Sequence, residues 1–582
     1  MSMTNLPARA EDHTLDVSER DRLDAAVADL SEGATRWAAA PLAERARLLG
    51  RTHAAMTLAA RSWAETAAAI KGLEPHSPLV GEEWISGPYA GIAGAGVLAH
   101  SLEALAHGSS PLAKRRIGTA PGGRVSIPVL PANAQQWLLL HGFSAEVWMP
   151  PGRTADEVRA AAGLGALTPT RSGGVGLVLG AGNITSIPPL DVLYEIVASN
   201  RSVLLKLNPV MSDMLPVFEK ALSPLIEFGV LRITNGGADV GGYLAHHAGI
   251  AHVHITGSAA THDAIVWGVG EDAARRRAAG TPQLTKPITS ELGGVSPIII
   301  VPSAWTKRDL RYQAEHVVTQ RLHNGGYNCI AGQVVVVSRD WAQKDAFLAE
   351  LRRALQEAPA RPAWYPGSDT RMEAAASSYP AAERFGPGGC RLLIDVHADD
   401  DASAVLSTEY FSPVLGVVEV SGTGQEFLDA AVDLANDEFV GTLGANVIVE
   451  PRVLRQLGDG FFEAIARLRY GTIAINAWTG LGFLTPTAPW GAFPGATIDD
   501  VQSGIGVVHN GFLIDGPERT IVRGPFRPFP RSFAHGEMTL FPKPPWFVQA
   551  RTAATTGRRL AGYAGAPSWL KMPGIFFAAF RA

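Results

Sequence analysis

The stretch Val175-Gly-Leu-Val-Leu-Gly-Ala-Gly-Asn183 joins a short apolar run to a glycine-rich turn. Such a run is typical of a strand that is buried on both faces of a parallel sheet. Three more runs follow, separated by helix-forming segments, at Ser202–Lys206, Leu231–Thr234 and His252–Thr256. Strands that alternate with helices predict right-handed crossovers and a parallel sheet. Ligands of such sheets lie where strands end and helices begin, so the turns after these strands are candidate binding positions.

A second alternating unit covers residues 289–450, with strands predicted at Ser296–Val301 and Pro413–Val420. The sequence therefore predicts an α/β protein with two parallel-sheet units. Shorter strands, bounded by prolines, are predicted at Arg124–Leu130 and Glu146–Met149.

Composition excludes several classes of protein. The 582 residues include 50 basic and 55 acidic side chains, a net charge of −5 with histidine neutral. This balance argues against nucleic-acid binding, which usually shows as a basic chain. The longest apolar runs fall far short of the ~18 residues of a membrane span, and the start lacks the pattern of an export signal. We therefore expect a cytoplasmic protein. Cys329 and Cys390 are too few for a disulfide framework or a four-sulfur zinc site.

Cys329 lies in the string Asn324-Gly-Gly-Tyr-Asn-Cys-Ile-Ala-Gly332, between glycines that let the backbone approach a ligand closely. The ordinary alternative is a buried structural cysteine, because free cysteine is among the most buried residues. A helix beginning at or just after Cys329 would lower the pKa of the thiol and supply an amide to an oxyanion. Cys329 is thus a candidate nucleophile.

Other motifs carry less information. The chain has no P-loop, and the GxGxxA strings at Gly94–Ala99 and Gly268–Ala273 do not follow predicted strands, so we reject both as dinucleotide fingerprints. Four clustered histidines have no carboxylate at ligand spacing, and we expect structural roles for them and no metal site. They are His246, His247, His252 and His254.

Cys329 belongs to an ordered set of motifs. Glu291 precedes it in Thr289-Ser-Glu-Leu-Gly-Gly-Val-Ser-Pro297. The other members, in chain order, are Gly182-Asn183, Leu204-Leu-Lys206, Ile255-Thr-Gly-Ser258, Glu409-Tyr-Phe-Ser-Pro413 and Pro489-Trp-Gly491. Over roughly residues 35–510 this set resembles the aldehyde dehydrogenase superfamily, because several motifs agree in type and order.

The resemblance implies catalytic roles for three residues. Cys329 would add to an aldehyde carbonyl, and Asn183 with the Cys329 amide would hold the resulting oxyanion. Hydride would then leave for a nicotinamide and give a thioester. Glu291, its pKa raised toward neutrality by burial, would activate the water that hydrolyses the thioester. The implied activity is NAD(P)-dependent oxidation of an aldehyde to a carboxylic acid.

The resemblance also implies a site for NAD or NADP. Lys206 and Glu409 match family residues that hydrogen-bond the two ribose hydroxyl pairs, and Phe411 would pack near the nicotinamide, with ordinary core as the alternative. NAD-selective relatives often carry a glutamate where this chain has Pro209, so NADP is also compatible with the sequence. The other expected cofactor contacts are Asn208, Gly257, Ser258 and Leu292, with Gly257 and Ser258 meeting the pyrophosphate at a helix start.

The resemblance divides the chain into three parts. Residues 1–288 would form the cofactor-binding domain, with oligomerisation strands at about 120–150, and residues 289–488 the catalytic domain. Residues 489–582 would hold an oligomerisation segment and a basic aromatic tail. A homodimer or homotetramer is implied.

Two other activities stay open. A CoA-acylating enzyme would pass the acyl group to CoA, and the Asn208-Pro209 pair keeps this alternative open, whereas Glu291 favours hydrolysis by water. A catalytically silent structural member would not need Cys329, Glu291 and Asn183 together. The substrate is expected to be an apolar aldehyde, because aromatic residues lie in the segment that approaches the substrate entrance in relatives. They are Trp478, Phe483, Trp490 and Phe493.

The segment from Thr539 to Ala582 carries six basic residues and no acid, with aromatic residues interleaved. One interpretation is an anchor at a membrane surface, in which basic groups meet anionic lipid. Packing on a neighbouring subunit is favoured instead, because prolines interrupt any long amphipathic helix.

Overall fold

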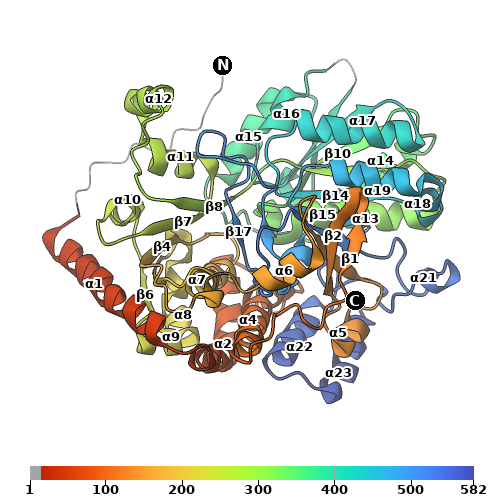
Figure 1. The fold of residues 1–582 in the computed structure, drawn as a ribbon. Helices are drawn as coiled ribbons and strands as arrows, with labels where there is room; N and C mark the ends of the chain where they lie inside the picture. Colours follow the sequence, from red (N-terminus) through yellow and green to blue (C-terminus); the bar gives the residue numbers. More distant parts are fainter. Residues whose placement is uncertain (1–14, 398–399) are drawn as a thin grey trace.

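A computed structural model describes residues 15–397 and 400–582, and its chain folds around two β-sheets (Figure 1). One sheet has five strands and the other eleven. The predicted α/β fold with two parallel-sheet units is confirmed. A third, two-stranded sheet pairs β16 (Trp490–Gly491) with β17 (Val507–Val508).

The five-stranded sheet is parallel throughout, in the order β6-β5-β4-β7-β8. Its strands are β4 (Val175–Leu179), β5 (Ser202–Lys206), β6 (Leu231–Thr234), β7 (His252–Gly257) and β8 (Ile288–Leu292). The predicted boundary at residue 288 thus falls at the start of its last strand.

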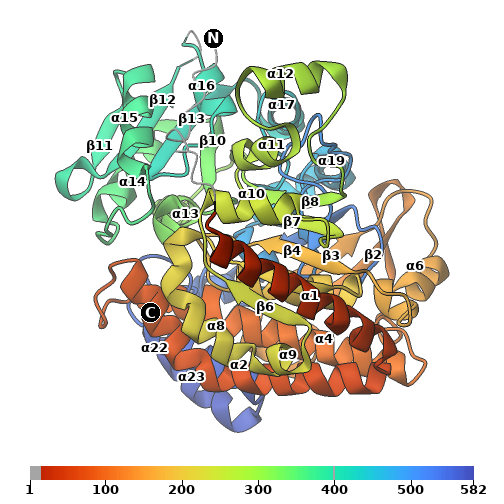
Figure 2. The ribbon, with the colours of Figure 1, turned by 90° about the vertical axis from the view of Figure 1, so that its left-hand side faces the viewer.

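Helices cover both faces of the five-stranded sheet (Figures 1 and 2). On one face Leu177 and Leu204 pack with α1 and α10, and on the other Val178 and Val203 pack with α7 and α8. The helices around this sheet are α1 (Val17–Ala39), α2 (Leu42–Ile70), α4 (Ala90–Ala106), α7 (Ile187–Ala198), α8 (Leu215–Ala221), α9 (Ser223–Phe228), α10 (Ala238–His246), α11 (Ala259–Trp267) and α12 (Gly270–Ala279).

The eleven-stranded sheet has the order β1-β2-β3-β18-β15-β14-β9-β10-β13-β12-β11. The run from β18 to β12 is parallel, and β1, β2, β3 and β11 are antiparallel to their neighbours. The strands are β1 (Gly118–Ala120), β2 (Arg124–Leu130), β3 (Ser144–Trp148), β9 (Ser296–Ile300), β10 (Gly332–Ser338), β11 (Glu383–Phe385), β12 (Arg391–Val396), β13 (Val414–Val420), β14 (Gly444–Ile448), β15 (Thr472–Ile475) and β18 (Arg519–Arg523).

The predicted β extension at residues 120–150 is present as β2 and β3, and it joins the second sheet rather than the first. β3 pairs antiparallel with β18, which in turn pairs parallel with β15 of the same chain. The extension is therefore continuous with the predicted catalytic domain within one chain. Its expected role in oligomerisation stays a prediction. The helices that cover this sheet include α13 (Lys307–Leu322), α14 (Lys344–Glu357), α15 (Ser368–Ser378), α17 (Gly424–Asp437) and α19 (Asp459–Arg467).

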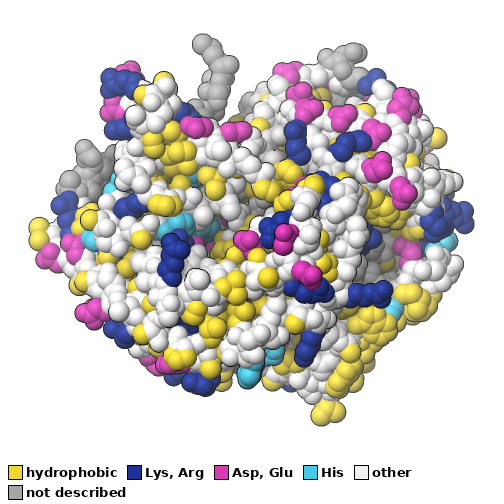
Figure 3. Space-filling model, viewed as in Figure 1, with side chains coloured by type: hydrophobic (Ala, Val, Ile, Leu, Met, Phe, Trp, Pro, Cys, Tyr) yellow, Lys and Arg dark blue, Asp and Glu magenta, His cyan; other side chains and the backbone are white. Residues whose placement is uncertain are grey.

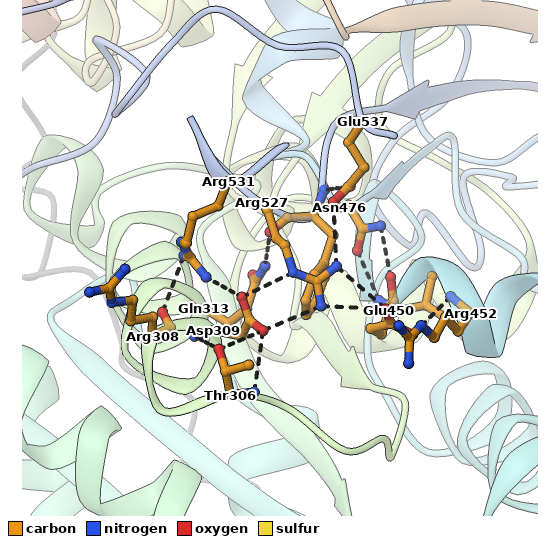
Figure 4. Close-up of polar contacts among 12 residues, drawn as sticks. Thr306, Arg308, Asp309, Gln313, Glu450, Arg452, Asn476, Arg527, Arg531 and Glu537 are labelled. Carbon is orange, nitrogen blue, oxygen red and sulfur yellow. Dashed lines mark hydrogen bonds and ion pairs between the residues drawn. The ribbon is translucent and has the colours of Figure 1, made fainter. Parts of the chain in front are cut away.

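A buried ionic cluster ties the segment after β18 to helix α13 (Figure 4). The Arg527 guanidinium lies 3.2 Å from the Asp309 carboxylate and 3.4 Å from the Glu450 carboxylate. Arg531 pairs with the same Asp309, which also caps α13 in a reciprocal arrangement with Thr306. Burial alone would raise the pKa of Asp309, but Thr306 and the two guanidinium groups lower it below its usual value. The cluster thus holds the segment that precedes the tail (Thr539–Ala582) against α13.

The rest of the tail packs mainly on its own chain. Helix α22 (Ala553–Gly565) contacts α3 (Val80–Trp84) and the π-helical turn Ile85–Tyr89, and the aromatic residues Trp546 and Phe547 are buried. Helix α23 (Met572–Ala579) and α5 (Ala134–Leu139) lie beside α22 (Figure 1). Trp546 and Phe547, which the sequence interpretation assigned to a contact with a neighbouring subunit, are instead buried within their own chain. No helix within the described residues is long and apolar enough to cross a membrane.

Candidate active site

A cavity of about 730 Å³ opens where the five-stranded sheet faces the eleven-stranded sheet. The turns after β4, β5 and β7 form one wall, as expected for the carboxyl ends of parallel strands. The second sheet contributes the loop before β10 and the segment before β13. Nine of the ten predicted site residues line this cavity: Asn183, Lys206, Asn208, Gly257, Ser258, Glu291, Cys329, Glu409 and Phe411. Leu292 is the exception, since it is fully buried and its backbone N–H donates to Ser503.

Cys329 lies in a turn between α13 and β10, and not at the start of a helix. The condition under which helix amides would lower its pKa, a helix beginning at or just after Cys329, is therefore not met. Burial raises the pKa of the thiol well above its usual value, and the nearby Glu291 carboxylate raises it further. Cys329 and Glu291 line the same cavity and each shifts the pKa of the other, so the two groups predicted to share the chemistry lie near each other.

Glu291 lies in β8 and is 3% exposed. Burial raises its pKa to about 7, although hydrogen bonds with Cys329 and Trp490 act in the opposite direction. The Trp490 indole N–H donates to Glu291 over 3.0 Å. A carboxyl group with this pKa can both accept and release a proton near neutral pH. The sequence indicated Trp490 as part of a motif and as a residue near the substrate entrance. Nothing in the neighbouring sequence indicated its contact with Glu291.

Asn183 is brought to Cys329 by the turn after β4. Its side-chain amide donates to the Tyr327 carbonyl over 2.9 Å, so it is tied to the loop that carries the cysteine. Gly182 allows this approach, because a Cβ there would lie 2.6 Å from the side chain of Asn208. The amide NH₂ has a second hydrogen, which makes it a neutral donor beside the thiol.

The loop before Cys329 is held by Asn324, which has a left-handed backbone with φ of 55°. The Asn324 amide nitrogen donates to the Asn183 carbonyl over 3.2 Å, and its side-chain oxygen accepts from Lys71 over 2.9 Å. Its backbone N–H donates to Glu82 over 2.8 Å. Lys71 is fully buried and pairs with Glu83 at 2.8 Å. Sequence reasoning missed this support, because its charged members lie in N-terminal helices far from the loop in sequence.

Lys206 and Glu409 are at opposite sides of the cavity, in the first and second sheet regions. Burial lowers the pKa of Lys206 to about 8, an effect that Asp239 opposes. Burial raises the pKa of Glu409 to about 8, and the Arg321 guanidinium acts against that rise. One buried oxygen of Glu409 has no hydrogen-bond partner among the described residues. Gly293 leaves space beside this oxygen, since a Cβ there would lie 1.9 Å from it. This carboxylate is suited to accept from a ligand hydroxyl group.

A second, smaller cavity of about 30 Å³ lies behind Cys329. Trp478, Phe483 and Trp490 line it, as the sequence suggested, together with apolar residues such as Ile184. Phe493 does not, and its ring packs against the Arg519 guanidinium instead. The space on this side of the thiol is apolar, and side chains must move to admit more than a few atoms.

No group of three His, Cys, Asp or Glu side chains that could hold a metal ion occurs in residues 15–397 and 400–582. The four histidines expected to be structural do not converge. His252 and His254 are buried on β7, whereas His246 and His247 end helix α10.

The model of the aldehyde dehydrogenase family matches residues 193–378, which include Lys206, Glu291 and Cys329. D-glyceraldehyde dehydrogenase (NADP(+)) of Thermoplasma acidophilum is 24% identical over 43% of this chain and 49% of its own length. N-succinylglutamate 5-semialdehyde dehydrogenase of Sphingopyxis alaskensis is 29% identical over 55% of this chain and 65% of its own length. The match thus spans about half to two thirds of these two relatives.

Solved structures show the same fold over most of the chain. Aldehyde dehydrogenase C of Pseudomonas syringae, crystallised with NAD⁺ and octanal, aligns with a TM-score of 0.58 and 19% identity, over 87% of this chain and 90% of its own. The NADP complex of glyceraldehyde-3-phosphate dehydrogenase from Bacillus halodurans aligns with a TM-score of 0.56 and 17% identity, over 87% and 91%. The family model, the two relatives and the shared fold all support the aldehyde dehydrogenase superfamily.

The contact between Cys329 and Glu291 predicts how the thiol reacts with an alkylating agent. Only the thiolate reacts, and the negative charge of Glu291 suppresses it. In a Cys390→Ser background, we expect slow alkylation by iodoacetamide at pH 7, accelerated about tenfold by Glu291→Gln, as one unit of pKa would give. Glu409→Gln is the graded control, because its charge raises the thiol pKa less. Equal rates with and without Glu291 would show that the two groups do not interact.

Proposed function

We propose that this protein oxidises an aldehyde to a carboxylic acid with NAD or NADP as the hydride acceptor. The observation that carries the proposal is that Cys329 and Glu291 line the same large cavity and shift each other's pKa. A nucleophile beside a base of pKa about 7 fits covalent catalysis at neutral pH.

In the proposed reaction, Glu291 takes the proton of the thiol as the sulfur attacks the aldehyde carbonyl. The amide of Asn183 and the backbone N–H of Cys329 stabilise the oxyanion that forms. The nicotinamide, when bound, accepts the hydride, and a thioester remains on Cys329. Glu291 then takes a proton from the water that attacks the thioester, and the sulfur leaves as the acid is released.

The residues around the cavity fit a dinucleotide. The unpartnered oxygen of Glu409 and the ammonium of Lys206 would hold ribose hydroxyls. Ser258, the N-cap of α11, and Gly257 would meet the phosphates at a helix start. Phe411 stands beside the ring of Tyr365, with centroids 4.9 Å apart, and would flank the nicotinamide.

Two other proposals are weaker. A CoA-acylating enzyme does not need a base beside the thioester, whereas Glu291 is buried against the thiol. A silent member would not need an unpaired carboxylate facing a cavity. The apolar lining behind Cys329 supports an apolar aldehyde as substrate.

The test combines product analysis with rapid kinetics, using octanal as the probe and NAD or NADP with and without CoA. We expect the free acid as product in both conditions. Cys329→Ala should lower the rate by at least about a thousandfold, whereas Cys390→Ala should leave it unchanged. Glu291→Gln should slow both the first burst of reduced cofactor and the later turnover, because Glu291 takes a proton before and after hydride transfer in the proposed reaction. Acyl-CoA as the product would favour the alternative, and an unchanged burst in Glu291→Gln would mean that the base acts only after hydride transfer.

The nature of residue 209 predicts the choice of cofactor. Pro209 carries no charge to repel a 2′-phosphate, and the neighbouring Asn208 lines the cavity and can donate to it. We expect kcat/KM for NAD to exceed that for NADP by less than about a thousandfold, or ~4 kcal/mol. Pro209→Glu should lower kcat/KM for NADP selectively, and Pro209→Gln, similar in size but neutral, should not. Equal effects of the two variants would place the 2′-position elsewhere.

The end of the tail presents an exposed apolar and basic surface, here called the tail face (Figure 3). Four large apolar side chains on it are exposed: Trp569, Leu570, Phe577 and Phe580. Phe580 contacts Phe529, which contacts Phe533, so these three phenylalanines form a continuous group. Four basic side chains of the same segment are exposed, namely Arg551, Arg558, Lys571 and Arg581.

We propose that the tail face rests on an anionic lipid surface. A two-fold contact between copies would press this face against itself, and basic groups with no acid within residues 539–582 would repel. Lipid phosphates supply the missing negative charge, and Trp and Phe favour the headgroup boundary.

This proposal predicts sedimentation with vesicles that contain phosphatidylglycerol, at low salt, and none with neutral phosphatidylcholine vesicles. The double variant Trp569→Ser, Phe577→Ser should stay in the supernatant. Leu58→Ser, Val269→Ser is the matched control, because both residues are exposed elsewhere on the surface. A tail-face variant that changes molecular mass in light scattering and leaves vesicle binding unchanged would identify the face as a contact between subunits.

A further inference from the structure

A row of polar side chains lies between β7 and α7, where a parallel sheet normally packs apolar residues against a helix. His252 and His254 alternate along β7 and point toward α7. Asp191 and Glu195, one helical turn apart on α7, point back toward them. All four side chains are at most 4% exposed. Burial of so many ionisable groups is unfavourable unless each has a partner.

Short polar contacts connect these groups along β7. Thr256 donates to Asp191 over 2.9 Å, and the His254 ring lies 3.3 Å from the Thr256 hydroxyl. The other ring nitrogen of His254 lies 2.9 Å from the Thr289 hydroxyl, which is 3.4 Å from His252. Thr289 thus bridges the two histidines.

The row continues to the edge of the molecule. His252 lies 3.4 Å from Glu195, and Glu195 pairs with Arg201 at 2.6 Å. The Arg201 side chain is 20% exposed, so this end reaches solvent. At the other end, the parallel register pairs Thr256 with Glu291. Thr289 and Glu291 are two positions apart on β8 and therefore share the face that holds the row. The row therefore runs along β7, from the side of the proposed base Glu291 to the opposite ends of the strands of the first sheet.

The proposed reaction must export protons from this buried end. Oxidation of an aldehyde by water and a nicotinamide yields a carboxylate, a reduced cofactor and two protons. Glu291 takes one proton from the thiol and one from water, and the carboxylic acid returns its own proton to the leaving sulfur, so that two protons pass through Glu291 in each turnover. The large cavity above Glu291 is where the dinucleotide would lie, and that ligand would close the direct way to solvent.

We propose that the row from Thr256 to Glu195 conducts protons from Glu291 to solvent at Arg201, an inference that rests on the proposed function. Each step moves one proton and leaves the count unchanged. Protonated Glu291 gives its proton to the hydroxyl oxygen of Thr256, its neighbour in the strand register, and the Thr256 hydroxyl passes its own proton to the ring nitrogen of His254 that faces it. His254 releases a proton from its other nitrogen to Thr289, whose hydroxyl proton passes to His252. His252 then releases a proton to Glu195 and from there to solvent.

The charges along the row suit this transfer. Burial would raise the pKa of Asp191 and of Glu195, but the histidines facing them lower each to about 2, so both are carboxylates. Burial would lower the pKa of His254, and Asp191 raises it above its usual value. His509, which directly follows β17, also contacts Asp191, at 3.1 Å. The ionisable groups facing the row from all sides are Asp191, Glu195, Arg201, His252, His254, Glu291 and His509.

A cluster with a purely structural role would not need an unbroken series of contacts between its members. The decisive residue is Thr289, because its hydroxyl is the bridge between the two histidines. Thr289→Val removes the hydroxyl with little change of shape, and Thr289→Ser keeps the hydroxyl and loses a methyl group. The pair separates proton transfer from packing.

The experiment follows reduced cofactor and released protons together, by stopped flow with a pH indicator in weak buffer, using octanal as the probe. Thr289→Val should keep the burst of reduced cofactor, slow steady turnover and proton release about tenfold, and increase the solvent deuterium isotope effect. Thr289→Ser should stay within about twofold of wild type. His252→Gln should act like Thr289→Val, although it lies farther from Glu291, because a break anywhere in a path has the same effect.

Several outcomes would overturn the proton path. Turnover of Thr289→Val at the wild-type rate would do so, as would an effect that falls with distance from Glu291, since that is the signature of electrostatic influence. If Thr289→Val and Thr289→Ser lose melting temperature and burst amplitude together, the cluster is structural. If wild-type protein gives no burst with aldehyde and either cofactor, the proposed function itself fails, whereas a normal wild type with unaffected variants removes the path alone.

Discussion

The active-site geometry depends on the polar contacts that hold Asn324 in a left-handed conformation. Asparagine tolerates this backbone better than most side chains, and here both its amide and its backbone N–H are used. On one side, Asn324 hydrogen-bonds to Lys71 and Glu82 from the N-terminal helical region. On the other side, its side-chain amide donates to the carbonyl of Asn183, in the turn after β4 of the first sheet. One side chain thus connects three parts of the chain and sets the position of Cys329.

The same burial that orders the site also tunes its chemistry. The thiol of Cys329 and the carboxyl groups of Glu291 and Glu409 all have raised pKa values, with desolvation as the first cause in each case. The thiol is therefore not a standing thiolate, and in the proposed reaction it loses its proton to Glu291 as it attacks. Such a nucleophile is protected from unwanted alkylation and oxidation until a carbonyl group is in place. The helix-amide activation suggested by the sequence is replaced by activation through a neighbouring base.

The fold could be predicted because it rests on local patterns. Apolar runs such as Val175–Leu179 alternate with helix-forming segments, and both sheets follow from that alternation. The residues around Cys329 could be predicted from the ordered motifs. Contacts between distant segments could not, since nothing local links Trp490 to Glu291 or Lys71 to Asn324. The strand pairing of β18 between β3 and β15 has the same origin, as it joins residues far apart in sequence.

The histidines of β7 show where a local pattern was visible and its meaning was not. His252, His254 and Thr256 recur with the period of a strand, so one face of β7 had to be polar although the strand is central in its sheet. Without the positions of Asp191 and Glu195 on α7, such a face has no evident partner. A buried charge that loses its partner strongly destabilises the fold. Apolar residues at this interface would avoid that loss of stability. A break with the packing rule that extends from the proposed base to the solvent is better explained by the movement of protons than by the stability of the fold.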